Sequence, residues 1–94
     1  HPGPMEKYVI PNLRNACQVL KVLAREPAGL KVSDIARHLD LPATTALRIV
    51  HTLALENLVR KDDARVFLGP ALIHLGASAI QTTSLREAAQ PVLE

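Results

Sequence analysis

Aromatic residues, cysteines and long apolar runs are all scarce in this 94-residue chain, and each shortage excludes something. One Phe, one Tyr and no Trp leave Leu, Val, Ile and Ala to fill a core. Cys17 is the single cysteine, which excludes an internal disulfide and a zinc site made by cysteine alone, and it suits a reducing cytoplasm. No apolar run approaches the roughly 20 residues of a membrane span, and no signal peptide is evident.

Apolar residues make up 48% of the chain, which suits one small domain with one core. A domain of this size buries a modest share of its surface, so we expect help from a partner such as a second copy. The net charge is only +2, so the placement of the basic residues must carry any argument for nucleic-acid binding. We interpret residues 1–4, which precede Met5, as the remnant of an expression tag.

Steps of three and four between apolar residues predict a first helix from Pro11 or Asn12 to about Pro27. Its expected buried face comprises Leu13, Ala16, Cys17, Leu20, Leu23 and Ala24. A second, short helix is expected to start at Ser33 as N-cap and to end near Asp40, a residue type that tolerates a left-handed turn.

A third helix is predicted directly after Pro42, because proline is favoured in the first turn of a helix. Its expected buried face comprises Ala46, Ile49, Val50 and Leu53, and Asn57 is its expected stop. The second and third helices are then joined by only three or four residues. A link this tight forces a steep crossing, which is typical of a helix-turn-helix.

Two extended runs, 58–61 and 65–68, flank an acidic turn at 62–64 and predict a β-hairpin, the wing of the motif. A linker helix is expected from Leu72 to about Gln81, and Ser84 is a candidate cap for a last helix. The predicted fold is mainly α with a small β-hairpin, a winged helix-turn-helix followed by a linker helix. The expected division is 5–69 for the winged domain, 70–83 for the linker helix and 84–94 for the start of a further domain.

The outward face of the third helix, about residues 43–57, holds the first candidate DNA contacts. With the apolar stripe buried, the outward residues are Thr44, Thr45, Leu47, Arg48 and His51. A helix in this position places such residues at base edges in the major groove. Arg48 is the best candidate base reader, because its guanidinium fork matches the O6 and N7 atoms of guanine. Leu47 has no donor and offers only apolar contact.

Basic residues beside the wing turn are the second group of candidates. Arg60, Lys61 and Arg65 are expected to meet phosphates or to reach the minor groove. Two acidic residues at the tip argue against deep insertion, and pairing within the hairpin is the simpler alternative for these charges. Ser33 and Lys31 are further candidates for the phosphate backbone, although N-capping is the simpler role for Ser33.

Four runs of the sequence resemble the IclR-type family of transcription regulators. Residues 30–49 resemble its helix-turn-helix, 67–72 the end of its wing, 75–76 its linker helix, and 85–94 the opening helix of its effector-binding domain. The resemblance implies a dimer that pairs through the first and linker helices, a palindromic operator and an effector domain that is almost wholly absent here. The chain differs from the usual pattern of the family at Asn15, Asp40, Ala43 and Ala64 and at residues 55–56. These differences bear on the affinity for DNA and on the sequence of the DNA site more than on the family.

Two other function classes compete with DNA binding. An enzyme is not supported, because the sequence offers no nucleophile with a partnered base, no metal-ligand spacing and no glycine-rich phosphate loop, and no cofactor is expected. His38, His51 and His74 are scattered over three predicted helices and suggest no metal site. A winged helix that binds protein without DNA is the stronger alternative, since fold alone does not decide function and the net charge is mild.

Overall fold

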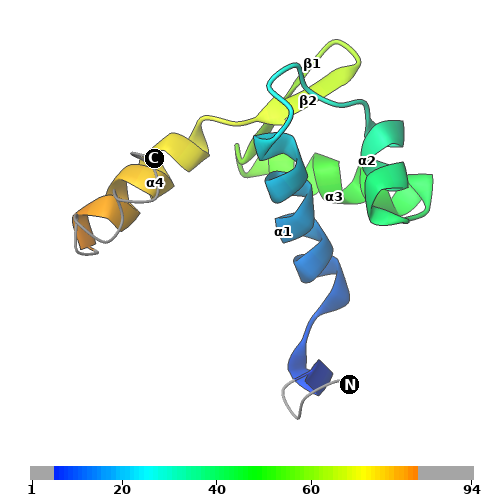
Figure 1. The fold of residues 1–94 in the computed structure, drawn as a ribbon, viewed down its shortest axis with the longest axis horizontal. Coiled ribbons are helices and arrows are strands. Elements are labelled where there is room, and N and C mark those ends of the chain that lie inside the picture. The colour runs from blue at the N-terminus through cyan, green and yellow to red at the C-terminus, as the bar shows by residue number, and fades with distance from the viewer. Residues whose placement is uncertain (1–5, 83–94) are drawn as a thin grey trace.

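The computed structural model describes residues 6–82, in which a small hairpin lies at one edge of a body of helices and a last helix projects away (Figure 1). The elements in chain order are a 3₁₀ turn η1 (Glu6–Tyr8), α1 (Pro11–Ala24), α2 (Val32–Leu39), α3 (Ala43–Leu55), β1 (Val59–Asp62), β2 (Arg65–Leu68) and α4 (Ala71–Thr82). This is the mainly helical fold with one hairpin that the sequence predicts. The expected tag remnant and the segment 84–94, with its predicted cap at Ser84, lie outside the described residues.

One core joins α1, α2, α3 and the hairpin. α1 packs on α2, α3 and β2, and α3 also packs on α2 and β1. The buried apolar residues are Val19, Val22, Leu23, Leu30, Ile35, Ala36, Ala46, Ile49, Val50, Leu53, Val59 and Val66. None of them is aromatic, as the composition requires, and α3 contributes the whole apolar stripe that its spacing predicts.

The link between α2 and α3 has three residues, Asp40, Leu41 and Pro42, and confirms the predicted helix-turn-helix. Asp40 takes up a left-handed conformation with φ 55°, and its backbone N–H bonds back to carbonyls of the last turn of α2. The Leu41 N–H donates to the Ala36 carbonyl at 2.9 Å. Pro42, with φ −58° and ψ 145°, then directs the chain into α3.

The start of α2 differs from the prediction, because Lys31 and not Ser33 is the N-cap residue. The Asp34 carboxylate accepts a hydrogen bond from the Lys31 backbone N–H at 3.2 Å, which supplies a partner for a donor at the helix start. Ser33 therefore lies within the first turn, exposed on the helix surface. The apolar Val32, which precedes the expected N-cap, is the first helical residue.

The hairpin has a two-residue turn and gains a third backbone partner. Asp62 pairs with Arg65 at the turn, and the first turn residue, Asp63, has φ 60°. Leu30, in the segment between α1 and α2, bridges Val66 of β2 through two backbone hydrogen bonds of 3.0 and 2.7 Å. The hairpin is therefore anchored to the chain before α2 as well as to the end of α3.

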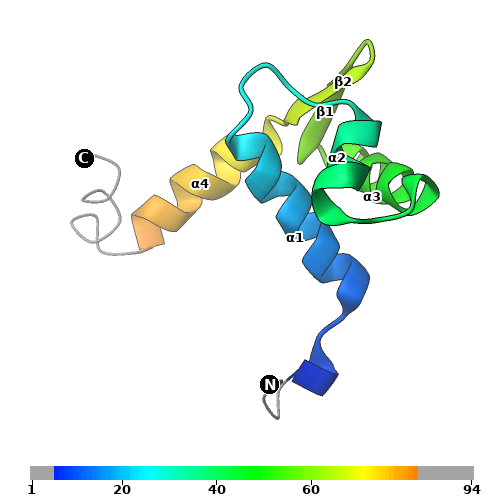
Figure 2. The same ribbon diagram turned by 45° about the vertical axis from the view of Figure 1, so that its right-hand side comes forward.

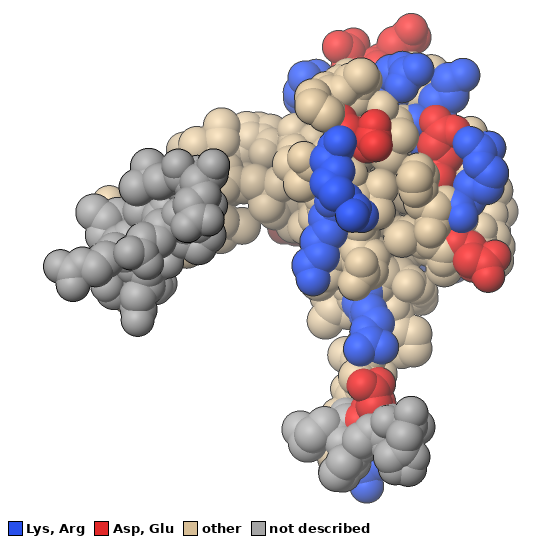
Figure 3. All heavy atoms as spheres, viewed as in Figure 1, with Lys and Arg blue, Asp and Glu red and all other residues tan. Residues whose placement is uncertain are grey.

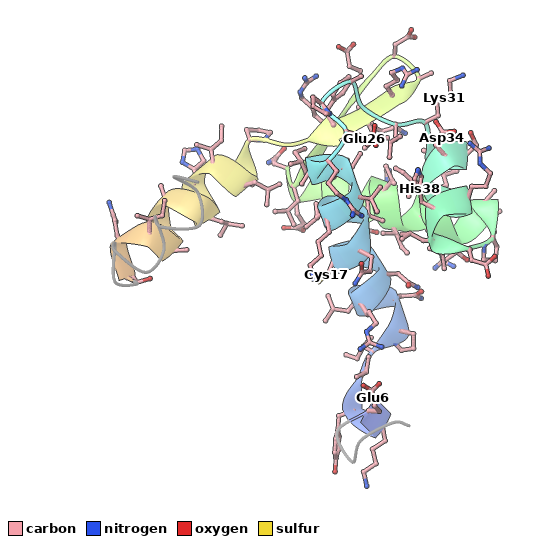
Figure 4. All side chains as sticks on the ribbon, viewed as in Figure 1. Glu6, Cys17, Glu26, Lys31, Asp34 and His38 are labelled. Atoms are coloured by element: carbon pink, nitrogen blue, oxygen red, sulfur yellow. The ribbon has the colours of Figure 1, made fainter. Side chains whose placement is uncertain are left out.

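The buried face of α1 differs from the predicted one. Val19, Val22 and Leu23 are buried, whereas Leu13 is 60% exposed and Cys17 is exposed. The reason is visible in Figures 1 and 2, where the N-terminal half of α1 extends beyond the body formed by α2, α3 and the hairpin. Figure 4 labels Cys17 midway along this helix. The prediction that Cys17 is a core residue is therefore wrong.

α4 leaves the body at Gly69 and Pro70, where the sequence predicts the boundary between the winged domain and the linker helix. A Cβ at Gly69 would lie 2.4 Å from the Asn57 carbonyl oxygen, so the close passage of the chain past the end of α3 requires glycine. Beyond this point α4 has no buried residue. Its apolar side chains Ile73, Leu75 and Ile80 are exposed, and residues 71–82 include no Asp, Glu, Lys or Arg.

Candidate nucleic-acid interface

The outward face of α3 holds the predicted base-contacting residues. Thr44, Arg48 and His51 are exposed, and Arg48 carries the only full charge on the helix. Within residues 6–82, no salt bridge or side-chain hydrogen bond occupies the Arg48 guanidinium, so all five of its N–H donors are free. The face is therefore rich in donors and is not neutralised by the protein itself.

Thr45 and Leu47 flank this face on opposite sides. Thr45 is half-buried, whereas Leu47 is about half exposed. Thr45 and Arg48 border a groove of about 320 Å³ between α3 and the first half of α1. The groove is lined by Asn12, Leu13, Ala16, Thr45, Arg48, Ile49, Thr52 and Leu53. Asn12 thus lies close to the candidate site, and only its place at the start of α1 could have suggested it.

The wing cations differ in how far the hairpin itself engages them. The Arg60 guanidinium carbon lies 4.5 Å from the centre of the Phe67 ring, and its Nη1 atom lies 3.7 Å from the Asp62 carboxylate. Lys61 is exposed, and in the described part of the chain no ion pair or hydrogen bond involves its side chain. Lys61 is therefore the wing cation that is free to meet an external anion.

Arg65 has an intramolecular partner that lies far away in sequence. Its Nη1 atom donates to the Gly29 carbonyl at 3.0 Å across a part-buried contact. A guanidinium has five N–H donors, so most remain available. Sequence reasoning missed this bond, because 36 residues separate the two partners and no local pattern links them.

The start of α2 lies beside the hairpin, where Figure 4 shows Lys31 and Asp34 together. The hydrogen bond from the Lys31 backbone, and then the Arg37 guanidinium, lower the pKa of Asp34 below its usual value. Asp34 therefore stays ionised and partly offsets the positive charge of Lys31 and Arg37. Ser33 is exposed here with a free hydroxyl, and within residues 6–82 its side chain has no hydrogen-bond partner.

Charges of both signs are interleaved on the surface of the body. Figure 3 shows acidic side chains at the tip of the hairpin with basic side chains below them, and a row of basic side chains along α1. Among residues 6–82, no group of three His, Cys, Asp or Glu is placed to hold a metal ion. No helix in the same range combines the length and the apolar character needed to cross a membrane.

Comparison with known proteins identifies the helix-turn-helix. Residues 13–63 match the IclR helix-turn-helix domain family. The glycerol operon regulatory protein of Streptomyces coelicolor is 39% identical over 79 residues, which cover 82% of this chain and 31% of that protein. The chain therefore spans about a third of the length of this relative.

Solved structures show the same fold. An IclR transcriptional regulator from Alicyclobacillus acidocaldarius has 38% identity and a TM-score of 0.78 over 82% of this chain and 32% of its own. An IclR family regulator from Brucella abortus has 25% identity and a TM-score of 0.76 over 97% of this chain and 36% of its own. All three of these proteins are named as regulators. The match over residues 13–63, together with the winged helix-turn-helix fold, shows that this chain belongs to the IclR helix-turn-helix family of DNA-binding domains.

Proposed function

We propose that this chain binds specific sites in double-stranded DNA, with α3 in the major groove and the β1–β2 hairpin on the backbone or in the adjacent minor groove. The observation that carries the proposal is Arg48, which is exposed and has no side-chain partner among residues 6–82, on a helix whose opposite face packs into the core. Recognition of a base requires a rigid helix with a free guanidinium group, because a side chain that contacts a base should not first have to break contacts within the protein.

Each predicted residue of α3 then has a role. Arg48 pairs with the O6 and N7 atoms of a guanine, and the exposed Thr44 bonds a base or phosphate. Thr45, which is half-buried beside α1, contributes its hydroxyl at the edge of the interface. Leu47 makes apolar contact with a thymine methyl group, and His51, one turn after Arg48, meets the backbone.

The hairpin and the start of α2 supply the sequence-independent contacts. Lys61 is the first phosphate ligand, since its side chain has no partner to give up within the described range 6–82. Arg60 and Arg65 contribute the donors that their partners within the protein leave free. Ser33 and Lys31 contact the backbone near the start of α2. Phosphate contacts of this kind fix the register of the protein on the duplex.

We further propose that two copies pair through α1 and α4 and bind a palindromic operator. An uncharged helix with exposed Ile73, Leu75 and Ile80 needs a cover, and α1 has an exposed apolar residue of its own, Leu13. A two-fold dimer of helix-turn-helix domains reads two half-sites about one helical turn apart. The operator symmetry then follows from the symmetry of the protein.

The role in the cell follows from the longer relatives. We propose that the chain is the DNA-binding part of a transcription regulator of the bacterial cytoplasm, where a small-molecule-binding domain follows in the complete protein. The name of the Streptomyces relative supports control of an operon. The sequence identity to this relative covers only the DNA-binding portion, so it supports a role in DNA binding more than the binding of any particular effector.

The test is a salt series of binding to a duplex from the gene's own promoter region and to a random duplex. Affinity for both should fall steeply with salt, and the promoter should bind more tightly. Arg48→Ala should erase most of that preference, because each bidentate pair contributes about 1–3 kcal/mol of discrimination. If neither duplex binds at low salt to a chain shown to be dimeric, DNA binding is refuted and the protein-contact alternative takes its place.

Sedimentation equilibrium tests the proposed pairing. Ile73→Glu should weaken self-association strongly, because it places a charge in the proposed interface while the side chain is 72% exposed in the single chain. His74→Glu introduces the same residue at the adjacent exposed position and serves as the control. Equal effects of the two substitutions, or none, would argue against pairing through this face of α4.

A further inference from the structure

A cluster on one face of the hairpin ties the wing to the loop after α1. Strand alternation places Arg60, Arg65 and Phe67 on the same face, since the register pairs Arg60 with Phe67. The Arg65 guanidinium donates to the Gly29 carbonyl at 3.0 Å. We call the contact of Arg65 with Gly29, backed by the Phe67 ring, the wing strut.

Gly29 is fitted to this cluster by its lack of a side chain. Its φ of +79° favours glycine, and a Cβ there would lie 2.7 Å from the Phe67 ring. The other partner of the ring is the Arg60 guanidinium, 4.5 Å from its centre. Backbone, aromatic ring and two guanidinium groups therefore form one packed unit, which brings the loop carbonyl within reach of Arg65.

The strut lies next to the backbone anchor of the hairpin. Arg65 immediately precedes Val66, which exchanges two hydrogen bonds with Leu30. The register places Val66 directly opposite Lys61, the wing cation that is free within residues 6–82. Whatever holds Val66 to the loop therefore also sets the position of Lys61.

We infer that Arg65 is a positioning residue for DNA binding: through the Gly29 carbonyl it holds the wing so that Lys61 meets the phosphate backbone. This inference rests on the proposed function. It goes beyond a simple phosphate contact, because it predicts that Lys61 loses its effect when Arg65 is changed. A flexible hairpin would lose conformational entropy on binding, whereas a braced one is already ordered before it meets DNA.

A double-mutant cycle on the whole chain tests the inference, with Arg65→Gln, Lys61→Gln and the double variant. Both positions are exposed, so the variants should fold. The readout is the slope of log affinity against log salt for a random duplex, which becomes shallower by about 0.9 for each phosphate that the protein no longer neutralises. In the wild-type background, Lys61→Gln should make the slope shallower by about 0.9 per bound wing. In the Arg65→Gln background, the same substitution should leave the slope almost unchanged.

Hydrogen exchange gives a second readout that is independent of DNA. Arg65→Gln should speed exchange of the Leu30 and Val66 amides, which bond to each other's carbonyls, while Lys61→Gln removes the same charge and should leave both unchanged. The positioning role would be overturned if the effects of the two substitutions on the salt slope were additive, or if Lys61→Gln had no effect in the wild type. Unchanged exchange of the Leu30 and Val66 amides in Arg65→Gln would overturn it as well. If the wild type binds no duplex at all, the proposed function itself fails, and only the exchange result then reports whether the strut forms.

Discussion

α3 and the β1–β2 hairpin are the two elements proposed to meet DNA, and they carry their charges in opposite ways. α3 has one full charge, Arg48, with no partner among residues 6–82. The hairpin has five charged residues in positions 60–65, and two of its three cations already have partners within the protein. The helix therefore presents one guanidinium group without a partner in that range, whereas the hairpin presents charges of both signs that are partly engaged within the protein.

The difference extends to the buried side of each element. α3 sends Ala46, Ile49, Val50 and Leu53 into the core, while each hairpin strand buries a single residue. The helix is therefore held by apolar packing. The hairpin adds to its packing on α1 and α3 the Leu30 bridge and the Arg65 contact. A helix held by its core suits sequence reading, and a braced hairpin suits positioning on a uniform backbone.

The largest expected effect concerns the buried face of α3. Leu53→Ala should lower the free energy of unfolding by about 2–5 kcal/mol, because it removes a side chain that is only 7% exposed and leaves a cavity. Leu55→Ala is a matched control on the same helix, since Leu55 is 69% exposed and should change stability by no more than about 0.5 kcal/mol. Urea denaturation measures both. Similar losses would mean that α3 is not held through its inward face.

The next effect separates charge from geometry on the outward face. Arg48→Lys keeps the positive charge and loses the fork, so affinity for the promoter duplex should fall by about 1–3 kcal/mol while the salt slope and the affinity for random duplex stay the same. Lys61→Arg is the converse control on the hairpin and should leave all three nearly unchanged. Fluorescence anisotropy provides the measurement. A uniform loss on both duplexes would make Arg48 a phosphate ligand and remove the contrast with the wing.

Much of α3 and of the helix-turn-helix could be predicted, because the information is local. The apolar spacing gives the buried stripe of α3, and Asp40 and Asn57 take the left-handed conformations expected at helix ends, with φ of 55° and 61°. The outward face then follows from helical geometry. The roles of its residues at DNA stay predictions until the binding experiments are done.

The errors lie where distant contacts decide the outcome. α1 has apolar residues on more than one face, and only the packing of α2, α3 and β2 selects Val19 and Val22 over Leu13 and Cys17. The partner of Arg65 is 36 residues away and is a backbone carbonyl, which no side-chain pattern reveals. The sequence leaves two alternatives for the wing cations, contact with DNA or pairing within the hairpin. The structure pairs Arg60 with Asp62 inside the hairpin, whereas the partner of Arg65 lies outside it and was not foreseen.

A smaller effect is expected at the tip of the hairpin. Asp63→Asn should raise affinity for every duplex by about 0.5–1 kcal/mol, because it removes a negative charge from the element that approaches the phosphates. Asparagine also tolerates the left-handed φ of 60°, so the turn should survive. Glu6→Gln removes the same charge at the far end of the molecule from the hairpin (Figure 4) and should leave affinity unchanged. No gain for Asp63→Asn would place the tip away from the DNA.

The smallest effect concerns Asp34, at the start of α2 beside the Leu30–Val66 bridge that braces the hairpin. Its pKa is lowered in the folded chain, first by the hydrogen bond from the Lys31 backbone and then by Arg37, from a usual value of 3.8. The unfolded chain therefore takes up this proton first, so the stabilisation is complete above that usual value and is lost as the pH falls through the lowered one. Thermal unfolding from pH 7 to pH 2.5 should show a smaller acid decline in Asp34→Asn than in the wild type. If the declines are equal, Asp34 does not stabilise this corner, and the brace of the hairpin depends on Arg65 and the Leu30 bridge alone.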